Sequence, residues 1–427
     1  MCGWFESNRC HQKKISGRGV IGSRTGFRFQ RLVRESSSLS VRTKIMINKD
    51  TFCALAYNGI SVNHDGTLDP CCQYLPDEYR PIQFTDYKTY VSTVRQQMHD
   101  DHVSGRRHTG CRKCWREEEL GLKSLRWYAN EFWYKDQATP VVSTDNPLFD
   151  IELRFGNTCN LKCMMCDPKA SSALYTERLM NADVFQRAAI PGVRVVRERV
   201  PEWWESSEFQ TFSTDLFQHA RRVNITGGEP FMIAETVDVL DRLLPQRNDV
   251  LISFNSNLTR LPKTVQQRLP QFPRLQLNVS LEGIGAMAEY LRYPCKWNEV
   301  DANIRTVIDL VGVRRIGVNH TLQHGSIYSL PALAEYCATL EIKMTYTMVQ
   351  GIDCLKLDSV PGADCEKFLQ WLETTPVVTD SDKNFLRNAV EAAVFDQQLY
   401  QDFRNYTSAL DQVRGTSWDQ VFSPSHA

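Results

Sequence analysis

Three cysteines within eight residues constrain this chain more than any other feature. They stand in Cys159-Asn-Leu-Lys-Cys163-Met-Met-Cys166, with three residues and then two residues between the thiols. Such short spacings let a tight loop wrap one face of a 4Fe–4S cluster, and three protein thiolates leave the fourth iron open to a small molecule. A zinc knuckle completed by a distant Cys or His is the alternative. The motif favours a reactive cluster.

The segments beside this loop predict strands. Asp150-Ile-Glu-Leu-Arg-Phe155 alternates apolar and polar residues and runs straight into the cysteine loop. Arg222-Val-Asn-Ile-Thr226 predicts a second strand, and it ends in Gly227-Gly228-Glu229-Pro230. Open and closed α/β folds place ligand-binding backbone at the carboxyl ends of their strands, so this glycine pair is a candidate ligand contact.

The two motifs together resemble the radical S-adenosylmethionine (radical SAM) superfamily over about residues 148–352. The resemblance implies that Cys159, Cys163 and Cys166 ligate a 4Fe–4S cluster, whose fourth iron is chelated by the methionyl amino and carboxylate groups of S-adenosylmethionine. It implies reductive cleavage of that cosubstrate to a 5′-deoxyadenosyl radical, which abstracts hydrogen from a substrate. An electron donor such as flavodoxin or ferredoxin follows from the same resemblance.

The resemblance also assigns cosubstrate contacts. The Gly-Gly-Glu-Pro segment meets the methionyl amino group, and Ser280-Leu-Glu282-Gly283 resembles the segment that meets the ribose. Arg292 stands where the family often keeps an arginine for the methionyl carboxylate, with a solvated helix-end arginine as the alternative. Two positions depart from the family: Met165 replaces an aromatic residue near the adenine, and Leu258 replaces the glycine after Asn257. The candidate cosubstrate residues are Met165, Gly227, Gly228, Glu229, Pro230, Asn257, Ser280, Glu282, Arg292 and Asn319.

The remaining core repeats a strand-then-helix pattern. Further strands are predicted at 252–258, 275–283, 315–322 and 342–349, with helices at 300–311 and 330–340, the second carrying Pro331 in its first turn. Six parallel units joined by right-handed crossovers predict an α/β fold, an open (β/α)6 barrel of partial TIM type. Residues 181–220 form an insertion that contains Trp203 and Trp204, for which we favour core packing over a lid.

A second set of cysteines precedes the barrel. Cys53 leads into a predicted hairpin with an Asp65-Gly66 turn that ends at Cys71-Cys72, and Cys111 and Cys114 follow with two residues between them. Four such thiolates close a complete site for zinc or 4Fe–4S. The pattern resembles the auxiliary-cluster extensions called SPASM and twitch domains, which implies Cys53, Cys71, Cys111 and Cys114 as ligands and Cys71 over Cys72. Those extensions usually follow the barrel. A site with four protein ligands favours electron transfer or stapling over substrate binding.

The chain divides into four predicted segments. Residues 1–45 are a basic leader, 46–135 the cysteine-rich domain, 148–352 the barrel and 356–427 a helical extension with helices near 383–394 and 400–413. The leader carries ten Lys or Arg and two Glu, which suits a transit peptide, a basic nucleic-acid-binding arm, or a translation start at Met46. We favour the start at Met46.

Composition narrows the function class. Fourteen cysteines, seven of them in metal-type spacing, indicate a reducing, cytoplasmic compartment. No apolar run approaches the roughly 20 residues that span a bilayer, and 50 basic residues against 50 acidic ones argue against general nucleic-acid binding. Relatives with auxiliary clusters often modify peptides or proteins, which makes these the favoured substrate. The alternatives are a nucleotide or small metabolite, or a non-catalytic Fe–S or zinc module.

Overall fold

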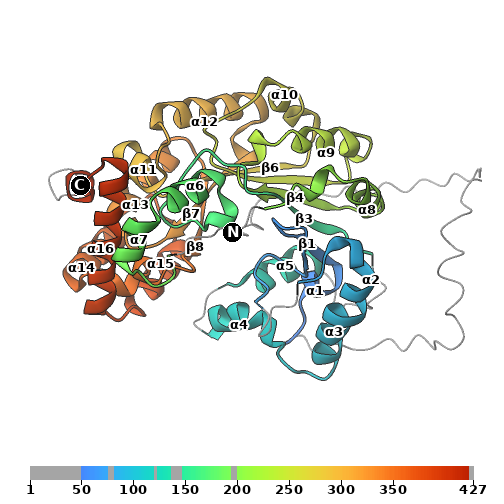
Figure 1. Cartoon of the computed structure of the whole chain (residues 1–427), viewed down its shortest axis with the longest axis horizontal. Coiled ribbons are helices and arrows are strands. Elements are labelled where there is room, and N and C mark those ends of the chain that lie inside the picture. The colour runs from blue at the N-terminus through green and yellow to red at the C-terminus, as the bar shows by residue number, and fades with distance from the viewer. Residues whose placement is uncertain (1–49, 76–80, 120–122, 136–146, 194–199, 423–427) are drawn as a thin grey trace, which may run out of the picture.

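A computed structural model describes residues 50–75, 81–119, 123–135, 147–193 and 200–422 (Figure 1). The basic leader and the three alternatives for its role lie outside these residues. None of the described helices is long and apolar enough to cross a bilayer.

One eight-stranded sheet forms the centre of the molecule, in the order β2-β1-β3-β4-β5-β6-β7-β8. Its six later strands are parallel and in sequential order, and helices connect them: β3 Asp150–Phe155, β4 Arg222–Gly227, β5 Leu251–Ser256, β6 Leu275–Ser280, β7 Ile316–Leu322 and β8 Lys343–Met348. The sheet runs from β2 at one edge to β8 at the other and is not closed. The predicted open (β/α)6 barrel is confirmed.

The cysteine-rich segment joins this sheet directly. Strand β1, Gly59–Val62, pairs in parallel with β3, and β2, Leu68–Asp69, pairs antiparallel with β1. The register places Ser61 opposite Glu152 on one side and Asp69 on the other. The turn at Asn63–Gly66, closed by a 2.9 Å hydrogen bond from Gly66 N to Asn63 O, therefore lies at the carboxyl edge of β3. The boundaries of the four predicted segments stay predictions.

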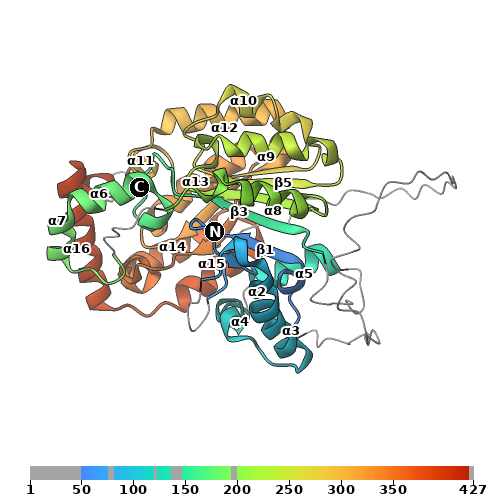
Figure 2. The same cartoon turned by 45° about the vertical axis from the view of Figure 1, so that its right-hand side comes forward.

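Helices cover the outer face of the sheet (Figure 2). Alternate strand residues such as Ile151, Val223, Ile252 and Leu277 are buried there against apolar helix residues. The connecting helices are α6 Ser172–Met180, α7 Ala182–Ala188, α8 Ser207–Phe217, α9 Glu235–Leu243, α10 Lys263–Gln266, α11 Gly285–Leu291, α12 Trp297–Val311 and α13 Ser326–Thr339. The repeated burial of one helix face against one strand face holds the layers together.

Helix α12 follows its predicted apolar spacing, with Val300, Ile304 and Val307 buried. For α13 the predicted first-turn position of Pro331 is wrong, because the helix begins at Ser326 and the proline lies inside it. A proline there removes one backbone hydrogen bond, and sequence periodicity does not report this. Trp203 and Trp204 are 7% and 5% exposed and pack around Phe155, which confirms the packing role of the insertion.

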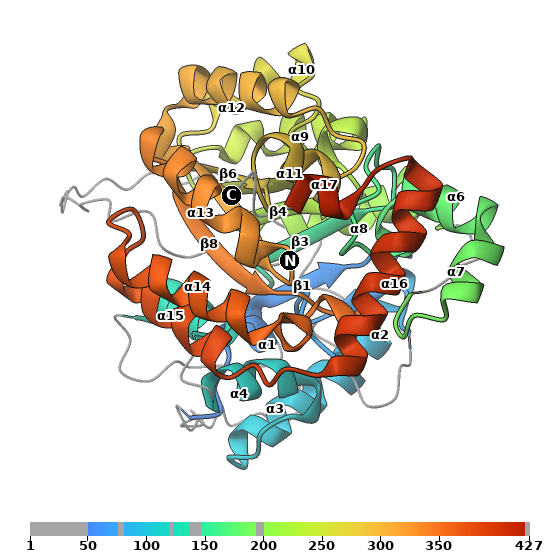
Figure 3. The same ribbon diagram turned by 90° about the vertical axis from the view of Figure 1, so that its left-hand side faces the viewer.

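The remaining helices lie at the two ends of the chain. The C-terminal helices pack beside α13, β8 and the cysteine loop (Figure 3): α14 Gly362–Thr374, α15 Asp380–Glu391, α16 Gln397–Arg414 and α17 Trp418–Phe422. The N-terminal helices gather below β1: α1 Ala54–Asn58, α2 Tyr87–Tyr90, α3 Gln96–Val103, α4 Arg112–Glu119 and α5 Leu125–Tyr134.

Candidate functional site

The candidate site lies where the parallel strands end. The cysteine loop follows β3, Gly227 ends β4, Asn257 follows β5 and Glu282 follows β6. The strands are parallel and in register, so their carboxyl ends meet at one edge of the sheet. Residues that are up to about 120 positions apart in the sequence therefore share one site.

Two of the three thiols of the loop, those of Cys159 and Cys163, lie close to hydrogen-bond donors. The backbone N–H of Leu161 donates to Cys159 Sγ at 3.4 Å, and Asn257 Nδ2 lies 3.8 Å from the same sulfur. Arg292 Nη1 lies 3.7 Å from Cys163 Sγ. Donors and a positive charge at sulfur stabilise thiolates over thiols.

Burial works in the opposite direction. It raises the pKa of Cys159 to about 12, with the charge of Cys163 adding to the effect, and it raises the pKa of Cys163 and Cys166. Without a bound metal these thiols are therefore protonated at neutral pH, and metal binding would displace their protons. The donors at Cys159 and Cys163 fit thiolates that share the negative charge of an iron–sulfur cluster.

Glu229 connects two strand ends through its buried carboxyl group. Its two oxygens accept hydrogen bonds from Ser256 Oγ at 2.7 Å, from Asn257 N at 2.7 Å and from Phe231 N at 3.2 Å. Burial raises the pKa of this carboxyl to about 7 in spite of these hydrogen bonds. Glu229 is thus a fixed acceptor whose charge is only partly compensated, which suits a cationic ligand group.

The glycines before Glu229 allow a close approach of backbones. Gly227 has a φ of +124°, which side chains rarely adopt. A Cβ on Gly228 would stand 2.2 Å from the carbonyl oxygen of Thr158, next to the first cysteine. The Gly-Gly pair is therefore required for the contact between the end of β4 and the cysteine loop.

Arg292 is buried rather than solvated, with 6% of its surface exposed, so the helix-end alternative is wrong. It forms a paired hydrogen bond and ion pair with Glu282, one bond of 2.8 Å from Nη2 to Oε1 and a second from Nε to Oε2. Burial alone would lower the pKa of Arg292, but the charges of Glu282 and Cys163 raise it overall. The pair fixes a positive group beside Cys163.

The other predicted cosubstrate residues occupy the same region. Ser280 lies opposite Asn319 in the β6–β7 register. Among the described residues, neither side-chain polar atom of Asn319 has a hydrogen-bond partner, although the residue is 1% exposed. Met165 and Cys166 line a pocket that Arg178 also borders.

Helix α16 supports the cysteine loop from the far end of the chain. Tyr406 OH donates to the carbonyl of Met164 at 2.7 Å. Arg414 donates to the carbonyl of Lys162 at 2.6 Å and pairs with the buried Glu177 at 2.7 Å. Sequence reasoning missed these contacts, since an arginine in the last turn of an amphipathic helix is ordinary by itself.

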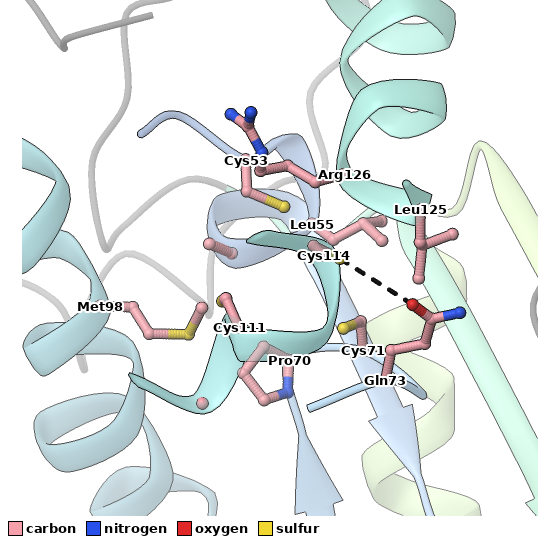
Figure 4. Close-up of a pocket in the computed structure, with 12 residues that line it drawn as sticks. Cys53, Leu55, Pro70, Cys71, Gln73, Met98, Cys111, Cys114, Leu125 and Arg126 are labelled. Atoms are coloured by element: carbon pink, nitrogen blue, oxygen red, sulfur yellow. Dashed lines mark hydrogen bonds between the residues drawn. The ribbon is translucent and has the colours of Figure 1, made fainter. Parts of the chain in front are cut away.

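The four upstream cysteines also come together. Cys53, Cys71, Cys111 and Cys114 line one pocket, which Figure 4 shows. Burial raises the pKa of each, that of Cys114 to about 12, and neighbouring thiols add to the effect at Cys71, Cys111 and Cys114. Cys72 is disulfide-bonded. In the part of the chain that the structure describes, no group of three His, Cys, Asp or Glu is arranged around a single-ion position.

This four-cysteine pocket lies near the amino-terminal ends of the strands, whereas the candidate site lies at their carboxyl ends. Cys53 precedes α1 and β1, and Cys71 follows β2 at the level of Gly59, which pairs with the first residue of β3. The six residues of β3 separate the two edges, a span of about 20 Å. The amino-terminal edge of such barrels commonly serves stability rather than catalysis.

The topology and the place of the cysteine loop together decide the architecture. The fold is an open (β/α)6 barrel whose cysteine loop follows its first strand, β3. No family model and no curated protein matches the sequence. Solved structures do match.

A structure of Streptococcus suis SuiB bound to precursor peptide SuiA has 12% identity and a TM-score of 0.36, covering 83% of this chain and 76% of that chain. A structure of anSMEcpe with bound AdoMet has 15% identity and a TM-score of 0.39, covering 53% and 59%. TYW1 with a lysine-pyruvate adduct has 15% identity and a TM-score of 0.28, covering 50% and 69%. At these values the matches carry no argument about chemistry, which rests on this chain's own residues.

Proposed function

We propose that the chain is a radical SAM enzyme that modifies a peptide or protein. One observation carries the proposal: the three thiols, Glu229, and the Glu282–Arg292 pair converge at one edge of the sheet and are linked through Asn257 and Cys163. A degenerate metal-binding module would have no need for this buried, charged arrangement, because buried charges destabilise a fold unless they are paired.

Each residue has a defined role in this proposal. Cys159, Cys163 and Cys166 would hold a 4Fe–4S cluster, which supplies the electron that cleaves S-adenosylmethionine when both are bound. Glu229 and the backbone of Gly227 and Gly228 would bind the methionyl amino group. Arg292, which Glu282 holds beside Cys163, would bind the methionyl carboxylate through its positive charge.

The remaining candidate residues would bind the ribose and the adenine of S-adenosylmethionine. Ser280, Asn319 and Pro230 line the edge, and the partnerless amide of Asn319 suits a hydroxyl-bearing ligand. Met165 provides an adaptable apolar surface for a ring. The proposal also includes an electron donor such as flavodoxin or ferredoxin, a cytoplasmic location, and a peptide or protein as substrate.

The upstream cysteines would hold an auxiliary Fe–S cluster with four protein ligands. Of the two roles left open by the sequence, the opposite-edge position favours stapling, since α1, α4 and the end of β2 all meet at this pocket. A metal there would fasten the N-terminal helices to the strand that extends the sheet, as structural metal sites do in small domains.

The test is anaerobic. Protein reconstituted with iron and sulfide is given dithionite and S-adenosylmethionine, and 5′-deoxyadenosine is quantified. We expect product from the wild type and from Cys337→Ala, a buried cysteine on α13 that is 1% exposed and outside the site. We expect none from the Cys159/Cys163/Cys166 triple alanine variant. Uptake of zinc alone, or product from the triple variant, would contradict the proposal.

A further inference from the structure

The inner face of the sheet is polar. On β4, β5 and β6 the residues that alternate with the buried aliphatic ones are Asn224, Thr226, Ser253, Asn255, Gln276, Asn278 and Ser280. The interior of a closed TIM barrel is filled by layers of branched apolar side chains. This open barrel instead presents amides and hydroxyls.

Some of these groups satisfy each other. Ser253 Oγ donates to Asn224 Oδ1 at 2.8 Å, and Asn278 Nδ2 donates to Asn255 Oδ1 at 3.0 Å. Buried polar groups are nearly always paired in this way. Any that are not paired therefore need a separate explanation.

Four unmatched groups lie together on three neighbouring strands. Within the described residues, Ser61 Oγ, Arg154 Nη2, Asn224 Nδ2 and Thr226 Oγ1 are buried and have no hydrogen-bond partner. The register places them side by side: Ser61 opposite Glu152, Glu152 opposite Asn224, and Arg154 opposite Thr226. All four carry hydrogens to donate. We call this set the donor cradle.

Charge decides what kind of acceptor the donor cradle suits. Arg154 is already paired with Glu152 at 2.8 Å, and Asp69 lies on the other side of Ser61 in the same row. Burial raises the pKa of Asp69 to about 6, and burial of His64 lowers its pKa to about 3, so the imidazole stays neutral. Among the residues that the structure describes, Arg154 is the positive group of the donor cradle, and its pairing with Glu152 leaves no surplus charge there for a phosphate or carboxylate. A neutral oxygen fits better.

The distance between donors on one strand indicates which neutral oxygens would fit the donor cradle. Asn224 and Thr226 are two residues apart on one strand, which separates them by about 6.6 Å. Carbonyl groups that point to the same side of an extended peptide repeat at that same distance. Resting on the proposed function, we propose that the donor cradle binds backbone carbonyl oxygens of an extended peptide substrate, and that the N-terminal strand β1 contributes Ser61 to it.

The first test needs no ligand. Removing a hydroxyl without a partner leaves no broken hydrogen bond, so Ser61→Ala and Thr226→Val are expected to keep or raise the melting temperature of the apo protein. The matched controls are Ser213→Ala and Thr407→Val, whose hydroxyls donate to Phe209 O at 2.8 Å and Phe403 O at 3.0 Å. These controls are expected to lower it. Equal losses in both pairs would show that the hydroxyls of the donor cradle have structural partners and would overturn the proposal.

The second test uses a pool of N-acetylated, C-amidated peptides, with a pool of nucleosides as comparison. The peptides should raise the melting temperature of the reconstituted protein. The Ser61→Ala/Thr226→Val double variant should need about tenfold more peptide for the same rise, since two hydrogen bonds are lost.

Three results would overturn the donor cradle: no rise with peptides in the wild type, an unchanged concentration dependence in the double variant, or a rise with nucleosides alone. The same samples are assayed for 5′-deoxyadenosine. A peptide-dependent rise without cleavage of S-adenosylmethionine means that the proposed function fails while the donor cradle stands.

Discussion

Replacing Glu229 by Gln tests the electrostatics at the centre of the site. Burial raises the pKa of this carboxyl from 4.5 to about 7, against the hydrogen bonds from Ser256, Asn257 and Phe231. The native protein therefore holds a proton more tightly than the unfolded chain does. The contribution of Glu229 to the free energy of unfolding is greatest below pH 4.5 and is lost as the pH rises through about 7.

The magnitude follows from the two pKa values. At about 1.4 kcal/mol per pKa unit, the full span corresponds to about 3 kcal/mol, of which about 2.5 kcal/mol falls between pH 5 and pH 8. The Gln side chain does not titrate, so the variant lacks this component. It also loses hydrogen bonds, because its amide N–H₂ group faces a donor, but that loss is the same at every pH.

The assay is anaerobic urea unfolding of the apo protein at pH 5 and pH 8. We expect the stability of the wild type relative to Glu229→Gln to fall by about 2.5 kcal/mol between these two values. Glu335→Gln, a change at an exposed position on α13, serves as the control for a solvated carboxylate. A difference between wild type and Glu229→Gln that does not change with pH would refute the reasoning.

Three further changes test separate parts of the structure. Gly228→Ala should abolish iron binding at the cysteine loop, because the added Cβ would stand 2.2 Å from Thr158 O. The control Gly362→Ala should keep its iron, because a Cβ at that position meets nothing within 4 Å. Normal iron content in Gly228→Ala would contradict the contact. Arg414→Met should lower the free energy of unfolding by about 2–3 kcal/mol, because the buried Glu177 then keeps only Lys162, 3.5 Å away, as a charged partner. A loss below about 1 kcal/mol in urea unfolding would disprove the support role of α16. Cys111→Ala/Cys114→Ala should lower the iron content from about eight to about four atoms per chain and lower the melting temperature, whereas unchanged iron or bound zinc would exclude an auxiliary cluster.

The local pattern of the sequence was sufficient for the core elements. The alternation at Asp150–Phe155 predicts β3 with its observed bounds, and the apolar spacing at Val300, Ile304 and Val307 predicts the buried face of α12. Patterns of this kind depend on neighbours a few residues apart, so the period of the element is written into the chain itself. The spacing of Cys159, Cys163 and Cys166 is equally local, and its place after a strand predicted the edge where the site lies.

Only the tertiary structure decided which partners these elements receive. The pairing of β1 with β3, the burial of Arg292 against Glu282, and the contact of Arg414 with the cysteine loop each join residues with no common periodicity. The sequence predicted that the four upstream cysteines form one site, but only the structure places that site at the amino-terminal ends of the strands, opposite the cysteine loop. The physical reason is that long-range contacts form only when packing compensates the entropy of closing the chain between them. The sequence by itself determined which residues bring chemistry to this protein, and the packing of the whole chain decided where each acts.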